Sequence, residues 1–428
     1  MGNKDLPLHW FALMAALWSV LFSPAKALAD LCDPMMEVTA CAYQLLQKGQ
    51  HGDAAIFFER ALDQEQSPKR RLQIALDLAH LYNNLGAYAK AAQTFQLAYA
   101  LQPETQTLRA LGFALIAAGD VQAARVAFEK AIKTSPTDSF LHRQLGYLCR
   151  QLHDRACAIE QFKAAIDHEE NPGTTELLRR EVRALSQTLW GSASFLWRTN
   201  ATPGQELRFG DRVLSQSQGI LEGNARIPLD LGSPDRWIAG FSRILWTIDG
   251  AAPTPQDESL QGGVGLKLKP FASQSIIIGV ERLISLGAFS RDDWLFRASA
   301  SKGAGFERPI GQKGKSWLFW SIYGDIAAIG LSKTDLQLSG EARLGRAAEF
   351  GPIQITPHLV LSGLWQDDAL GRSSLLEGGP GLTISLPIGA GVYKAPMQKI
   401  DLTVQYRNNI AGTSRNPNGV TVTLSLSF

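Results

Sequence analysis

The sequence predicts a multidomain α + β protein, in which an α-solenoid of helical hairpins is followed by an antiparallel transmembrane β-barrel. Three observations predict this fold: a pattern that repeats in the first half of the chain, a change of composition near residue 190, and alternation of apolar and polar residues up to the last residue. The chain has 428 residues, more than one ordinary core holds, so at least two domains are expected.

The first 29 residues are predicted to be a signal peptide. Lys4 supplies a positive charge, residues 10–22 form an apolar run too short to span a membrane, and Ala27-Leu28-Ala29 is a small-residue cleavage site. We expect cleavage after Ala29. No later run is long and apolar enough for a transmembrane helix, which leaves a closed barrel as the way to cross lipid.

Residues 30–172 carry the repeated pattern. When Gly49, Gly86, Gly119 and His153 are aligned, small residues, phenylalanines and alanines fall into register five, nine and twelve positions later. The three sets are Ala54, Ala91, Ala124 and Ala158; Phe58, Phe95, Phe128 and Phe162; and Ala61, Ala98, Ala131 and Ala165. Spacing and residue types resemble the tetratricopeptide repeat, a pair of helices packed through small residues. We therefore expect periplasmic tetratricopeptide repeats over 30–172.

Residues 173–189 are predicted to form a capping helix and linker, because their apolar stripe would seal the last repeat. The four cysteines after the signal peptide are Cys32, Cys41, Cys149 and Cys157. An even count in an exported chain favours disulfides, and three pairings are open. Cys149 and Cys157 fall on two helices of one predicted hairpin, so a bridge there is reasonable and Cys32–Cys41 would follow. Buried, unpaired cysteines are the alternative.

Residues 190–428 are predicted to be an outer-membrane barrel. This half contains eight of the ten tryptophans and 31 of the 39 glycines, as expected for aromatic girdles and strand turns. The last ten residues, GVTVTLSLSF, alternate strictly and end on Phe428. This ending resembles the signal that the barrel-assembly machinery reads, so that machinery and outer-membrane lipid are expected partners.

Thirteen alternating runs can be found in this half, among them 336–345, 353–365, 376–386 and 400–407, but single-chain bacterial barrels have even strand numbers. We expect one early run, 206–213 or 220–229, to be a linker or to merge with its neighbour, which gives twelve strands. Fourteen is the alternative.

The inward positions of the predicted strands carry charges of both signs. In one interpretation these charges pair with one another and fill the lumen; in the other they form a polar path that offers hydrogen bonds to sugar hydroxyls. A twelve-strand barrel is narrow, which favours the first. The lumen candidates are Glu281, Arg297, Asp325, Glu341, Arg343, Glu377, Asp401 and Arg407.

No catalytic or metal-ligating constellation is found, so we expect neither an enzyme nor a cofactor. The histidines are scattered, and the cysteines lack the paired spacing of zinc sites. The near balance of 42 Lys plus Arg against 40 Asp plus Glu gives no reason to expect nucleic acid. Trp317, Phe319, Trp320 and Tyr323 lie close together on one predicted strand, where membrane-interface anchoring is favoured over sugar stacking.

Residues from about 235 to 428 resemble the C-terminal domain of the bacteriophage adsorption protein A family of outer-membrane receptors. The segments that carry the resemblance are Leu260–Lys267 (LQGGVGLK), Gly279–Arg282 (GVER), Asp293–Arg297 (DWLFR), Tyr323–Asp325 (YGD) and Glu341–Arg343 (EAR). The resemblance implies a barrel behind periplasmic repeats that works with an inner-membrane glycosyltransferase to make or secrete a surface polysaccharide, and that phage use as a receptor. The plan is also similar to exopolysaccharide export porins, although this chain has only about four repeats.

Two functions follow as hypotheses. The first is an exopolysaccharide secretion component whose barrel is the exit or the anchor and whose repeats bind a periplasmic partner or the glycan. The second is a closed-barrel scaffold that recruits envelope proteins without transport.

Overall fold

The computed structural model describes residues 36–199, 217–233, 235–248, 257–288, 290–309, 314–331, 334–368, 371–413 and 418–428. The chain divides into two compact units, Met1–Leu148 and Cys149–Phe428. The expected signal peptide, Cys32 and the run 206–213 lie outside the described residues.

Helical hairpins make up the first unit. Its helices are α3 (Val38–Gln47), α4 (His51–Gln64), α5 (Pro68–Asn84), α6 (Tyr88–Leu101), α7 (Thr105–Ala118) and α8 (Val121–Thr134), and α9 (Ser139–Gln151) crosses into the second unit. The four residues aligned in the sequence all lie in turns between paired helices and have positive φ: Gly49 (74°), Gly86 (75°), Gly119 (84°) and His153 (62°). This left-handed turn explains why glycine recurs there, since it has no Cβ to clash.

The recurring alanines and phenylalanines form the core between the helices. Phe58, Phe95, Phe128 and Phe162 are all buried, as are the alanines aligned with them. At Gly112 in α7, an added Cβ would lie 2.5 Å from the ring of Phe128. The small residues are therefore required by the close approach of the paired helices, as the repeat predicts.

The second unit begins at the end of α9, which forms the last hairpin with α10 (Arg155–Asp167). Helix α11 (Pro172–Ser186) follows. Leu178, Val182 and Leu185 form a buried apolar stripe on α11, which packs against α10. A disulfide joins Cys149 to Cys157 across the turn at His153. Cys41 is also disulfide-bonded.

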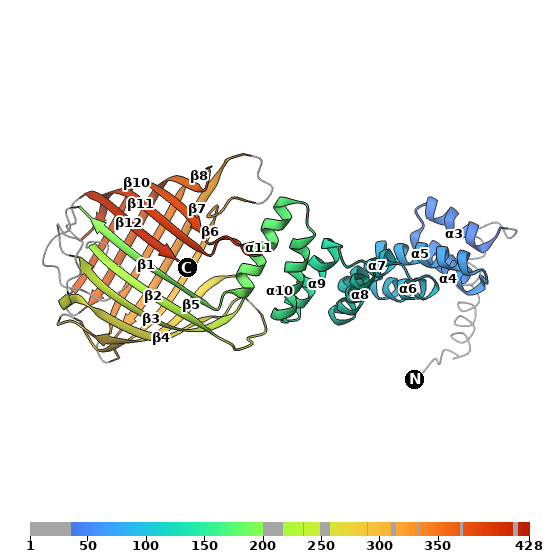
Figure 1. The fold of residues 1–428 in the computed structure, drawn as a ribbon, viewed down its shortest axis with the longest axis horizontal. Coiled ribbons are helices and arrows are strands. Elements are labelled where there is room, and N and C mark those ends of the chain that lie inside the picture. The colour runs from blue at the N-terminus through green and yellow to red at the C-terminus, as the bar shows by residue number, and fades with distance from the viewer. Residues whose placement is uncertain are drawn as a thin grey trace, which may run out of the picture. The chain divides into compact units, whose positions relative to one another are not determined.

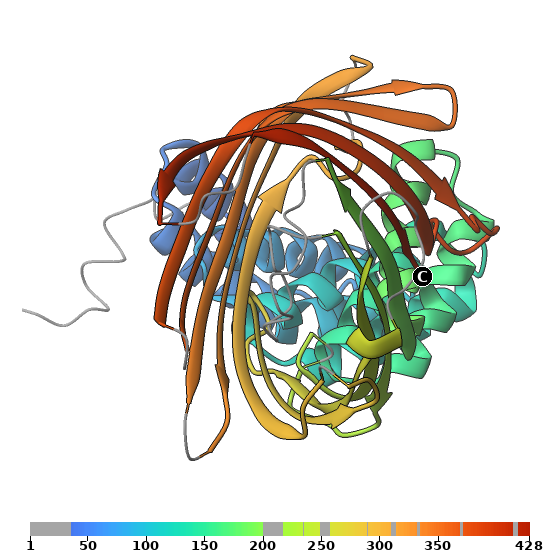
Figure 2. The ribbon, with the colours of Figure 1, turned by 90° about the vertical axis from the view of Figure 1, so that its left-hand side faces the viewer.

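In the described part of the chain, twelve antiparallel strands close into a barrel (Figures 1 and 2). Each strand pairs with its neighbours in sequence, and β1 pairs with β12 to complete the ring. The strands are β1 (Leu189–Arg198), β2 (Ser217–Ile227), β3 (Trp237–Ile248), β4 (Gln261–Lys269), β5 (Ser275–Ser285), β6 (Asp293–Ala304), β7 (Ser316–Ile329), β8 (Asp335–Phe350), β9 (Ile353–Asp368), β10 (Gly371–Ile388), β11 (Gln398–Gly412) and β12 (Gly419–Ser427). The predicted fold and strand number are confirmed, and the run 220–229 is strand β2.

The two faces of the barrel wall differ in polarity. Along β11, Leu402, Val404 and Tyr406 are 38%, 40% and 45% exposed on the outside, whereas Gln405 and Arg407 are 2% and 3% exposed on the inside. The same alternation runs through the other strands, so the outer face presents an apolar surface of the kind that lipid covers. No helix among the described residues is long and apolar enough to span a membrane.

The interpretation of four aromatic residues as membrane-interface anchors is wrong for two of them. Trp317 and Phe319 are only 4% and 7% exposed and share a buried cluster with Ala347, so these two side chains point into the barrel. They cannot anchor the protein at a membrane interface, because that role requires an outward position.

Candidate functional site

Arginines and glutamates from several strands meet inside the barrel between β8 and β1. Arg198 of β1 donates two hydrogen bonds to the carboxylate of Glu377 on β10, at 3.0 and 2.5 Å, and both side chains are fully buried. Arg407 of β11 lies 3.8 Å from Glu377 and 3.1 Å from Glu341 of β8. Arg343 pairs with Glu341 at 2.7 Å. We call these five residues the first lumen network.

Neutral polar groups complete the first lumen network. Arg407 donates to the side-chain oxygens of Gln405 and Ser362 at 2.7 to 3.0 Å. The amide of Gln405 lies 3.0 Å from Nε2 of His358. The ring of His358 also contacts Phe319, with 6.4 Å between centroids. Hydrogen bonds and ion pairs thus link inward side chains of β1, β8, β9, β10 and β11.

A second lumen network lines the opposite wall. Arg243 of β3 donates to both carboxylate oxygens of Glu281 on β5, at 2.7 and 2.6 Å. Strand β4 lies between them, and its residue at the crossing point is Gly263, where an added Cβ would lie 1.8 Å from the Glu281 carboxylate. The pair can therefore form only because position 263 has no side chain.

Two more pairs belong to the second lumen network. Lys267 bonds Glu222 at 2.5 Å, and Arg297 pairs with Asp325 and donates to the Tyr323 hydroxyl at 2.9 Å. All of these groups except Asp325 line a pocket of about 320 Å³ in the lumen. Side chains of both signs face it, and each of these charges has a partner of the opposite sign.

The structure places all eight lumen candidates inside the barrel. Asp401, the one not yet described, accepts a hydrogen bond from Ser385 at 2.5 Å and lies 3.1 Å from Lys399. Several further residues of the two lumen networks were not among the candidates: Arg198, Glu222, Arg243, Lys267, His358 and Gln405. Arg243 and Glu222 lie in strands whose alternation is interrupted by inward apolar side chains and glycines. For Gln405 and Arg198 the alternation was visible and could have identified them.

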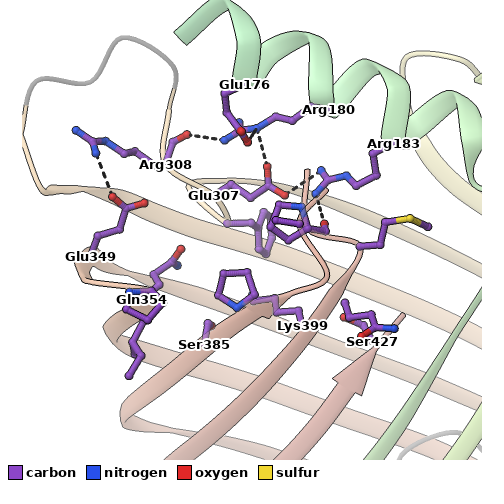
Figure 3. A pocket seen from close by; sticks show the side chains of 18 of the residues that line it. Glu176, Arg180, Arg183, Glu307, Arg308, Glu349, Gln354, Ser385, Lys399 and Ser427 are labelled. Atoms are coloured by element: carbon purple, nitrogen blue, oxygen red, sulfur yellow. Dashed lines mark hydrogen bonds and ion pairs between the residues drawn. The ribbon is translucent and has the colours of Figure 1, made fainter. Parts of the chain in front are cut away.

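A larger hollow lies at the end of the barrel where β1 begins and β12 ends, which we call the helix end. The pocket has a volume of about 1070 Å³ and lies between α11 and the rim of the barrel (Figure 3). Its rim comes from the turns that follow β6, β8 and β10 and from the end of β12. Gln354, Ser385 and Lys399 lie on the barrel side, and Arg180 and Arg183 of α11 lie on the helix side (Figure 3).

Arginines of α11 contact the rim turns. Arg180 and Arg183 both pair with Glu307, at 3.1 and 2.9 Å (Figure 3). Arg183 also donates to the carbonyl of Pro396 at 2.8 Å, and Arg179 to that of Val392 at 2.7 Å. The rim acid Glu349 instead pairs with Arg308, at 3.1 Å, and not with the helix.

A third contact joins the end of α9 to α11 and to the turn after β2. Arg150 bonds Glu181 at 2.5 Å and Asp235 at 2.8 Å. Burial raises the pKa of the Glu181 carboxyl, although the Arg150 charge beside it acts in the opposite direction. The pKa of Arg150 is raised, because its bonds to Asp235 and Glu181 outweigh the effect of burial.

Phe428 closes the ring at the helix end. Its backbone N–H donates to the carbonyl of Gly191 at 3.0 Å, and its carbonyl accepts from the N–H of Gly191 at 2.8 Å. An added Cβ at Gly191 would lie 2.7 Å from the Phe428 ring. The C-terminal phenylalanine thus packs against the first strand where the barrel closes.

Two known families match parts of the chain, one in the barrel and one in the helical hairpins. Residues 251–423 match the family described as "Bacteriophage N adsorption protein A C-term". The matched residues run from the segment before β4 into β12 of the barrel. Residues 72–105 match a tetratricopeptide repeat, in α5 and α6. The resemblance that the sequence suggested is confirmed, and this match together with a closed barrel fits an outer-membrane protein.

Relatives with known names or structures match parts of the chain. Bacteriophage adsorption protein A of Escherichia coli (strain K12) is 25% identical over 357 residues, which cover 77% of this chain. This chain spans only 35% of that relative's length. The crystal structure of MamA is 18% identical with a TM-score of 0.29 and covers 35% of this chain and 83% of that chain. A tetratricopeptide repeat protein from Parabacteroides merdae is 15% identical with a TM-score of 0.31 and covers 35% and 58%.

Proposed function

We propose that this protein is the outer-membrane component of a system that makes or secretes a surface polysaccharide, with the barrel as a closed anchor and the repeats as a periplasmic arm. The family match over 251–423 and the repeats that precede it support this role. The arm would bind an inner-membrane glycosyltransferase, another periplasmic protein or the glycan itself. The proposal assigns no catalytic step and no cofactor.

One observation carries the anchor role: charges in both lumen networks are paired and deeply buried. Arg198, Arg243, Glu281 and Glu377 are each 4% exposed or less, so water scarcely reaches them. A hydrated channel would leave the charged groups along its wall open to solvent. Paired charges of a narrow barrel instead fill its interior and give it rigidity.

Deleting the gene tests the role in the polysaccharide system. We expect less surface polysaccharide, measured by sugar analysis of washed cells, and recovery when the full chain is restored. Unchanged polysaccharide in the deletion strain would contradict the proposal.

The barrel as an exit for the glycan is the second candidate, favoured by the hollows of about 320 and 1070 Å³ in the lumen and at the helix end. Restoring the deletion strain with Ser299→Trp separates the two roles, because Ser299 lines the lumen pocket and an indole would occupy it. An anchor with this change restores the polysaccharide fully, whereas an exit does not. Heat-modifiable migration of the variant on gels checks that the barrel has folded.

Use of the barrel by phage is a further proposal. The curated relative is named for bacteriophage adsorption, and the strand ends away from α11 would offer the contact surface. Loss of phage adsorption by the deletion strain, with recovery on restoring the chain, would support it.

A further inference from the structure

The two faces of α11 are held by forces of different strength. On one face, Leu178 and Val182 are fully buried and Leu185 nearly so, against α10. Burial of aliphatic side chains is the strongest contribution available to a short helix. α11 is therefore firmly attached to the hairpin that precedes it.

The opposite face is held to the barrel rim by charges that solvent reaches. Arg180 and Arg183 are about a quarter exposed, and their shared partner Glu307 is 44% exposed. Ion pairs in such positions contribute little, because water screens them and long side chains lose freedom when they pair. Arg180 also has an alternative partner on its own helix, Glu176 at 3.2 Å.

Polar contacts also join the helices to one rim turn, the turn after β10. Arg179 donates to Val392 and accepts through its own carbonyl from the N–H of Ala395, at 2.7 and 3.3 Å. Lys163 of α10 lies 5.7 Å from the ring centre of Tyr393. All three rim residues belong to the turn after β10, residues 389–397.

Beneath α11, the contact with the rim is incomplete. The pocket of about 1070 Å³ separates much of the helix from Gln354, Ser385 and Lys399 (Figure 3). A permanent interface is close-packed, with few voids larger than a water molecule. A helix that spans a hollow and is fixed by exposed charges matches a contact that forms and breaks.

We infer that α11 is a latch, which closes the pocket at the helix end of the barrel and releases from the rim while it stays packed on α10. Glu307 is the centre of the latch, because two arginines of α11 converge on it. Release exposes the pocket and lets the helical arm move relative to the membrane anchor.

Hydrogen exchange of the full chain in detergent or nanodiscs tests the latch directly. In Glu307→Gln we expect the amides of residues 389–397, that of Ala395 above all, to exchange about 2- to 30-fold faster, the range for loss of two exposed ion pairs. Peptides from α11 itself stay protected, because its apolar stripe is untouched. High salt accelerates the same amides in the unchanged protein, since it screens exposed charges.

The matched control is Glu349→Gln. This acid lines the same pocket, and its carboxylate pairs with the side chain of Arg308, whereas Arg180 of α11 bonds the backbone carbonyl of Arg308 at 3.1 Å. Removing the Glu349 charge leaves that carbonyl and Glu307 in place, so the exchange of 389–397 should stay as in the unchanged protein. The inference is overturned if the two variants behave alike, or if α11 loses its protection together with the turn, since the helix would then unfold rather than release.

Cysteine labelling gives a second readout. Ser385 is 1% exposed and lines the pocket, and Ser362 is 2% exposed inside the lumen. No free cysteine is present in the described part of the chain. Glu307→Gln should speed the reaction of Ser385→Cys with a bulky maleimide and leave that of Ser362→Cys unchanged. Equal labelling of Ser385→Cys with and without Glu307 contradicts the latch, whereas fast labelling of Ser362→Cys in the unchanged background contradicts the closed anchor instead.

Discussion

Gly263 shows how a single residue determines which charged side chains can pair in the lumen. Arg243 and Glu281 belong to strands that are not neighbours, and they reach each other across β4 at a position without a side chain. Gly381 has the same role on β10, where an added Cβ would lie 2.7 Å from His358 and 2.8 Å from Gln405. Inward glycines thus allow side chains from the flanking strands to bond each other.

Gly263→Ala should lower the stability of the barrel. The new methyl group would displace the Glu281 carboxylate from Arg243, with a loss of about 1.5–3 kcal/mol, the range for hydrogen bonds to charged groups. Urea titration in detergent measures this change. Gly240→Ala on the adjacent strand is the control, because nothing lies within 4 Å of an added Cβ there; equal effects of both substitutions would refute the explanation.

Glu377→Gln tests the cost of an unbalanced charge in the first lumen network. The substitution keeps the shape of the side chain but leaves Arg198 and Arg407 without their shared anion, which should cost about 3–5 kcal/mol. Arg372→Gln on the same strand breaks a pair with Asp367 in which the arginine is 77% exposed, and it should cost less than about 1 kcal/mol. Similar unfolding midpoints for the two variants would contradict the burial of the network.

At the scale of the helix, close approach explains the repeat. Gly112→Ala should destabilise the helical unit by about 1–3 kcal/mol, because the methyl group would overlap the ring of Phe128. Gly52→Ala in α4 meets open space, and should be neutral or add up to about 1 kcal/mol through helix propensity. Thermal unfolding followed by circular dichroism compares them, and a stabilising Gly112→Ala would contradict the packing described.

Elements with regular periodicity were predictable from the sequence, and their ends were not. In β11 the predicted core 400–407 lies within Gln398–Gly412, because inward and outward residues alternate without interruption. β8 extends to Phe350, five residues past its predicted run 336–345, and β10 begins at Gly371, five residues before its run 376–386. Within the predicted runs, Pro357 and Pro380 interrupt the apolar alternation, although the backbone pairing continues through them.

In the lumen, the sequence identified eight inward charged residues but not which residue pairs with which. Which arginine meets which glutamate depends on strand register and on gaps such as that at Gly263, and neither leaves a signal in periodicity. Trp317 and Phe319 show the same limit: aromatic clustering on one strand was visible, but the face that they occupy was not. The latch on α11 was outside the reach of the sequence, because Glu307 and Arg183 lie in different elements far apart in the chain.

At the scale of the whole molecule, the barrel has an apolar outer face and a lumen filled by paired charges. Conductance of the purified protein in planar lipid bilayers tests this claim most directly. We predict insertion without steady conductance, and short openings at most in Glu377→Gln. Steady, ion-conducting pores formed by the unchanged protein would contradict the closed barrel.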